Sequence, residues 1–168
     1  MNKREAALTE RGLAIVAAHT NGDRAGRDSL IEKFINEYEF QRLADAFTYS
    51  ALVGVELAAT ARSVQFRVAI NDVVPDSEAV LLPDKPVPWD EAKWLAEHVK
   101  FGGDDIQLSA SMMDQQGAVN GSFQLAVSAL RALEVLPQFR GQTAGGLASF
   151  LIANLAAGVG VDDDGDDE

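Results

Sequence analysis

The sequence predicts a mainly α-helical, single-domain bundle of five or six helices. Apolar residues recur at helical spacing in most segments, and four of the five prolines fall within one connection. An uncharged run from Gly141 to Val161 then precedes a strongly acidic end. A chain of 168 residues is most simply one domain. We therefore expect one helical domain over residues 1–161 and a disordered acidic tail over residues 162–168.

The first two expected helices form a hairpin. The first runs from Arg4 to Thr20, where apolar residues repeat every three or four positions. Gly22 suits the left-handed conformation that ends a helix, and Asp23 can accept hydrogen bonds from the free amides of the next one. The second helix has one apolar side, formed by Leu30, Ile31, Phe34, Ile35 and Tyr38. The short connection predicts that the two helices are antiparallel.

The third expected helix, from Phe40 to Arg62, is the longest and is the predicted centre of the bundle. After residue 45 only Glu56 and Arg62 are charged, so we expect it to be buried nearly all round. The pattern then changes, because apolar residues alternate with others between Val64 and Ile70. Alternation is typical of a strand, yet the same residues also fit a helix. A helix and a short β element are both open alternatives there.

Residues 71 to 88 interrupt the helical pattern. Pro75, Pro83, Pro86 and Pro88 lie in this stretch. Proline lacks a backbone N–H and breaks helices, so neither a long helix nor a central strand can cross it. A fourth helix is expected from Trp89 to Phe101, ended by the glycines that follow.

Three further segments complete the expected bundle. Between Ile106 and Met112 the apolar residues alternate as in a strand and also fit a helix, so both alternatives stay open. Phe123 to Leu133 has a clear helical pattern that Pro137 stops. The last helix should cover Thr143 to Ala157, inside the uncharged run.

Composition excludes several classes of function. The chain has no cysteine, which excludes disulfides, thiolate nucleophiles and cysteine-ligated metals. Its start lacks the apolar region of a secretion signal, so we expect a cytoplasmic protein. The net charge is −12, which would repel a phosphate backbone, so direct binding to nucleic acid is not expected. Residues 162–168 hold six acids and nothing apolar, which predicts the disordered tail.

The uncharged run from Gly141 to Val161 must be hidden by a core, a bilayer or a partner. Alanine and glycine dominate it and polar side chains interrupt it, so a membrane span is not expected. We expect a helix that is buried or covered by a partner protein, whose small residues permit close backbone approach. The predicted interaction surface consists of Leu147, Phe150, Leu151 and Leu155.

The two histidines are the next candidates for function. His19 lies near the end of the first helix, where we expect it to interact with terminal carbonyl groups. His98 lies one helical turn after Trp94, and Asp104 follows beyond the glycines. Such a cluster could bind a ligand or serve acid–base chemistry. A solvated helix end followed by a polar turn accounts for the same residues, and we favour that interpretation.

No catalytic motif, metal-ligand set or cofactor-binding loop stands out, so we predict no catalytic residues, no metal and no cofactor. The leading hypothesis is a non-catalytic, cytoplasmic protein that binds a protein partner or itself. One alternative is a small enzyme or ligand-binding domain with a site near Trp94, His98 and Asp104. Another is an acidic decoy for a nucleic-acid-binding protein, although the body acids are scattered along the chain.

Overall fold

The computed structural model describes residues 1–102 and 114–162, and these residues form helices and no strand. The predicted mainly α-helical bundle is therefore confirmed, while Ile106–Met112 and the tail beyond Asp162 lie outside the described residues. The helices are α1 (Lys3–Thr20), α2 (Arg24–Glu37), α3 (Arg42–Arg62), α4 (Phe66–Asn71), α5 (Trp89–Lys100), α7 (Gln115–Glu134), the short 3-10 helix η1 (Pro137–Phe139) and α8 (Ala144–Ala156).

Local signals in the sequence account for several helix ends. Asn2 and Glu5 form a capping box at the start of α1, each side chain accepting from the other's backbone N–H at 2.9 Å. Gly22 ends this segment with φ of +78°, a conformation that glycine adopts at little cost. The side chain of Asp23 then caps α2, and that of Thr143 caps α8.

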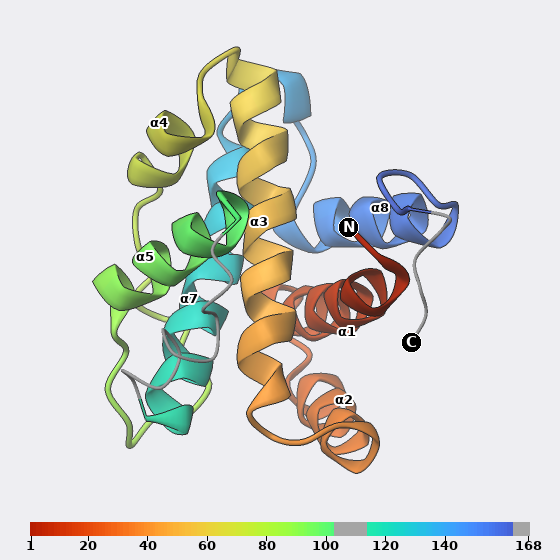
Figure 1. Ribbon diagram of the computed structural model, residues 1–168, viewed down its shortest axis with the longest axis vertical. Helices are drawn as coiled ribbons and strands as arrows, with labels where there is room; N and C mark the ends of the chain where they lie inside the picture. Colours follow the sequence, from red (N-terminus) through yellow and green to blue (C-terminus); the bar gives the residue numbers. More distant parts are fainter. Residues whose placement is uncertain (103–113, 163–168) are drawn as a thin grey trace.

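The centre of the bundle is the pair α3 and α7, which pack along each other through the middle of the molecule (Figure 1). The prediction that α3 is buried nearly all round holds for most of its circumference, while Glu56 and Thr60 are exposed. The more deeply buried helix is α7, in which every residue from Gly117 to Leu130 is buried. The helices α1, α4, α5 and α8 pack against this pair, and α2 packs on α1.

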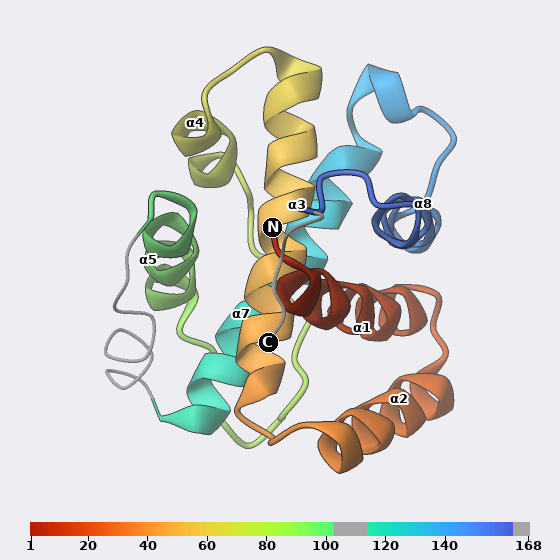
Figure 2. The ribbon, with the colours of Figure 1, turned by 45° about the vertical axis from the view of Figure 1, so that its right-hand side comes forward.

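On one side of this pair, α1 lies between α8 and α2 (Figure 2). It crosses α3 very closely at Gly12, where an added Cβ atom would lie 2.6 Å from the Ala46 carbonyl oxygen and 2.5 Å from Ser50 Oγ. Only a glycine permits this approach without moving the backbone. The α2 helix is peripheral, because Arg27 and Phe34 are its only buried residues.

The segment Val64–Ile70 contains a helix from Phe66 onward and no strand, so the β alternative is wrong for these residues. Ser63 ends α3 in the left-handed conformation with φ of 55°, and α4 begins at Phe66. Its buried residues Phe66, Ala69 and Ile70 follow the helical spacing of three and four, while Val68 is 43% exposed. The alternating residues therefore do not share one buried face, as they would in a half-buried strand.

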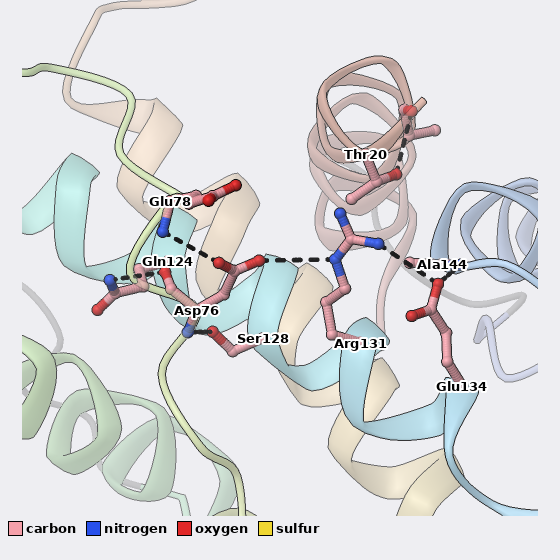
Figure 3. A network of polar contacts seen from close by, with 9 residues as sticks. Thr20, Asp76, Glu78, Gln124, Ser128, Arg131, Glu134 and Ala144 are labelled. Atoms are coloured by element: carbon pink, nitrogen blue, oxygen red, sulfur yellow. Dashed lines mark hydrogen bonds and ion pairs between the residues drawn. The ribbon is translucent and has the colours of Figure 1, made fainter. Parts of the chain in front are cut away.

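A row of polar side chains on α7 binds the backbone and side chains of the proline-containing connection between α4 and α5 (Figure 3). Ser128 accepts a hydrogen bond from the backbone N–H of Asp76 at 2.9 Å, and Gln124 donates to the Asp76 carbonyl at 3.0 Å. Arg131 forms an ion pair with the Asp76 carboxylate at 3.5 Å. Nearer the start of α7, Asn120 binds residues 82–86 of the same connection. These contacts fix the course of the chain into α5.

Candidate functional site: the outer face of α8

The α8 helix has one face inside the protein and one face outside it. Ala144, Leu147, Ala148 and Leu151 are buried in the core, where α8 packs on α1 and α7. The outward residues are Gly146, Ser149, Phe150, Ala153, Ala156 and Ala157. Phe150 is the one large side chain among these outward residues and is 51% exposed. We call these six residues the α8 face.

The four residues of the predicted interaction surface differ in their exposure to solvent. Leu147 and Leu151 are 0% and 9% exposed, so the protein's own core already uses them and they are unavailable to a partner. Leu155 is half-buried and packs against the edge of the core. Phe150, at 51%, is the only exposed residue of the four. The prediction is therefore corrected at Leu147 and Leu151, because the inner half of the helix faces α1.

The α8 face is uncharged in a strongly acidic chain. No charged residue occurs between Gly141 and Val161, while the chain as a whole carries −12. Charge depletion with retained apolar area is typical of the central part of protein interfaces. Most positions of the face carry small side chains, which also leave the helix backbone open to close approach by another helix.

A groove between α1 and α2 borders α8. It has a volume of about 690 Å³, and Ile152 of α8 lines it together with Ala14, Leu30 and Phe34. Arg11 bridges the groove's rim with two hydrogen bonds of 2.8 Å to Glu37, and this contact raises the pKa of Arg11. The rim charges are balanced while the interior is apolar, so the groove extends the neutral area beside α8.

The histidine–tryptophan cluster is partly assembled. The rings of Trp94 and His98 stack at 5.1 Å with an interplanar angle of 12°. Asp104 lies outside the described residues, so its relation to the pair stays a prediction. His98 is half-buried rather than solvated, and its Nε2 is a buried atom with no hydrogen-bond partner among the described residues. Arg67 and Phe101 lie in the same pocket, although no pattern in the sequence connects either of them with Trp94 and His98.

The side chain of His19 contacts α2 and α7 rather than the carbonyl groups at the end of α1. Its ring lies edge-on to Phe123 with the centroids 5.0 Å apart. Arg27 Nη1 donates to His19 Nδ1 at 3.1 Å, which requires this nitrogen to be unprotonated. Burial lowers the pKa of His19, and the nearby cations Arg27, Arg24 and Arg131 lower it further, against a raising effect of Asp76.

We expect acid to destabilise the protein through His19. The unfolded imidazole takes up a proton near its ordinary pKa of 6.5, while the folded one resists until a lower pH. The stabilising contribution is therefore present above pH 6.5 and is lost as the pH falls below it. Thermal melting between about pH 7.5 and about pH 5.5 should show a smaller decline for His19→Gln than for the wild type. Equal declines would contradict this role.

Among the described residues, no group of three or more histidine, aspartate and glutamate side chains is placed to hold a metal ion. No helix in the described ranges is both long and apolar enough to cross a membrane.

The fold and its surface together define an all-helical bundle with a neutral outer helix face. No protein-family model, curated protein or solved structure matches the chain.

Proposed function

We propose that this chain is a non-catalytic, cytoplasmic protein that binds a second copy of itself through the α8 face. The observation that supports the proposal is the half-exposed, uncharged α8 helix in a chain of net charge −12. A cytoplasmic setting is part of the proposal, because the chain has no cysteine and disulfides are typical of secreted proteins.

Charge favours the α8 face over the acidic parts of the surface as the contact between two copies. Two copies repel each other, so the contact must exclude the acids. In a two-fold dimer the same patch meets itself, and a charged group near the axis would face its own like charge. The α8 face meets this condition because it carries no charge.

The size of the contact implies that the groove takes part. The 13 residues of α8 span about 20 Å, and one face of such a helix buries less than the roughly 800 Å² per partner of a standard interface. The apolar groove beside Ile152 supplies adjacent area without adding net charge. We therefore include the groove lined by Ala14, Leu30 and Phe34 in the proposed interface.

Sedimentation equilibrium at micromolar protein tests the proposal. The wild type should be dimeric, and Phe150→Asp should be monomeric, because the substitution places a charge on the α8 face opposite its own copy. Val74→Asp is the matched control, since Val74 is 77% exposed and belongs to the connection after α4 rather than to α8. It should leave the dimer intact.

Salt provides an independent check. Raising the salt concentration from about 0.1 M to about 1 M shortens the screening length from about 10 Å to about 3 Å and should strengthen the dimer. A wild type that stays monomeric at both salt concentrations would overturn the proposal. Equal dissociation of Phe150→Asp and Val74→Asp would place the interface elsewhere.

A further inference from the structure

A second feature lies on the other side of the molecule, between α4 and the C-terminal end of α5. It is a pocket of about 360 Å³. Its lining residues are Arg67, Trp94, Glu97, His98, Phe101 and Gly102. Small-molecule sites are typically pockets of about 300–1,000 Å³ with aromatic walls and a few convergent polar groups. The volume falls within this range, and the lining combines aromatic rings with two oppositely charged side chains.

Two aromatic side chains of the pocket, Trp94 and Phe101, are each half-exposed and each contact a second ring of the protein. Trp94 is 49% exposed, and its ring stacks on His98 at 5.1 Å. Phe101 is 51% exposed, and its ring meets the buried Phe66 edge-on at 5.9 Å. Each open ring is therefore held by a second ring of the protein. Such preorganised aromatic surfaces bind a flat ligand at a low entropic cost.

The pocket also contains one basic and one acidic side chain that do not pair with each other. The guanidinium carbon of Arg67 lies 4.5 Å from the centroid of the Phe101 ring. Stacking occupies the face of a guanidinium group and leaves its N–H edge for a carboxylate. Neither Arg67 nor Glu97 forms an ion pair within the described ranges, whereas Lys100 nearby is paired with Glu56 at 3.0 Å.

We propose that this pocket binds a small zwitterion that carries an aromatic ring, of which an aromatic α-amino acid is the simplest example. Its carboxylate would bind Arg67, its ammonium group would bind Glu97, and its ring would pack against Trp94. A simple anion would be repelled by Glu97, and a simple cation would be repelled by Arg67. Only a ligand with both charges is attracted by both side chains.

In this proposal His98 is a positioning residue. Its ring supports Trp94, and its buried Nε2 is not exposed to a ligand in the pocket. The site is separate from the α8 face, so binding of the zwitterion does not depend on self-association.

Titration with L-phenylalanine, followed by tryptophan fluorescence, tests the proposal because Trp94 is one of two tryptophans in the chain. The fluorescence should change saturably, with a Kd of about 0.1–1 mM for so small a ligand. Three probes each lack one group: 3-phenylpropionate lacks the ammonium group, phenethylamine lacks the carboxylate and L-alanine lacks the ring. Each should bind at least about tenfold more weakly than L-phenylalanine.

Two single substitutions test which side chain binds each charged group of the ligand. Arg67→Gln should weaken L-phenylalanine binding about tenfold and abolish its advantage over phenethylamine, which has no carboxylate to lose. Glu97→Gln should likewise abolish the advantage over 3-phenylpropionate. Lys93→Gln, a change on α5 outside the pocket, is the control and should bind as the wild type does.

Circular dichroism serves to check that each variant is folded. The absence of a saturable change up to about 10 mM L-phenylalanine would overturn the proposal. Binding weaker than this has a free energy of less than about 3 kcal/mol in magnitude and does not require a specific site. Equal binding of L-phenylalanine and the three probes, or unchanged selectivity in Arg67→Gln and Glu97→Gln, would overturn it as well. The Phe150→Asp variant should bind L-phenylalanine as the wild type does, which separates this result from the oligomeric state.

Discussion

Gly12→Ala should destabilise the protein by about 2–3 kcal/mol and lower its melting temperature by roughly 5–10 °C. The new Cβ atom would lie 2.6 Å from the carbonyl oxygen of Ala46 and 2.9 Å from its carbonyl carbon. These are backbone atoms of α3, which cannot turn away as a flexible side chain could. The clash therefore forces α1 away from α3, and this loss of packing exceeds the gain of about 1 kcal/mol that alanine offers inside a helix.

Gly146→Ala is the matched control for this prediction. Gly146 is also helical, but it is exposed, and a Cβ atom there meets only Thr143 Oγ1, at 3.3 Å. Because Gly146 belongs to the α8 face, both variants are melted at a protein concentration that keeps the chain monomeric, where this change should alter stability by less than about 1 kcal/mol. Thermal melting by circular dichroism measures both variants. A Gly12→Ala protein as stable as the wild type would show that α1 and α3 can separate at this crossing at little cost.

Asn120→Leu should destabilise the protein by about 2–4 kcal/mol, because it leaves several backbone groups of the α4–α5 connection without partners. Asn120 is fully buried and accepts from the Leu82 N–H at 2.7 Å. Its amide group also donates to the carbonyl oxygens of Leu82, Lys85 and Pro86 at 2.9 to 3.2 Å. Two amide protons serve these three acceptors, so the donor capacity of the side chain is fully used.

Ser122→Ala provides the comparison within the same helix. Ser122 is also buried, but its hydroxyl group donates to the Ala118 carbonyl of its own helix at 2.7 Å. Alanine removes that bond without exposing a partner in another segment, so the cost should stay below about 1 kcal/mol. Urea unfolding measures the free energy of each variant, and amide exchange at Leu82 reports the connection itself. Similar losses for the two variants would contradict the role assigned to Asn120.

Most helices and their ends were predictable because local signals agree with the final packing. The stop at Gly22 and the cap at Asp23 are both found where the sequence places them. The segment at Val64–Ile70 was ambiguous, because six residues of helix are too few for its period to differ clearly from alternation. The segment forms a helix because only a helix buries Phe66, Ala69 and Ile70 on the same side.

The deep burial of α7 was not predictable from its composition. Asn120, Gln124 and Ser128 resemble the solvent side of an amphipathic helix. In the structure they face a proline-containing connection whose backbone groups need partners, so polar residues are suited to a buried position. The hydrogen bonds that make these polar residues suitable for burial join two segments that are far apart in the sequence. Leu82 and Asn120, for example, are 38 residues apart. The periodicity of one segment alone therefore does not indicate them.

The candidate sites were predictable only in part. An uncharged run indicates that α8 is covered, but it does not show which side faces α1, because nearly every side of the helix is apolar. Trp94 and His98 were paired correctly through their helical spacing. Arg67 was missed because it reaches the pocket from α4, whose position against α5 depends on tertiary packing.

Cysteine cross-linking is the most direct test of self-association through the α8 face. The chain has no cysteine, so single substitutions at Gly146, Ser149, Ala153 and Ala157 each introduce the only thiol. In a two-fold dimer, residues near the axis approach their own copies, and a disulfide forms where the Cα atoms come within about 7 Å. We expect at least one of the four to form a disulfide-linked dimer much faster than the Val74→Cys control. Cross-linking of all four no faster than that control would contradict the proposed interface.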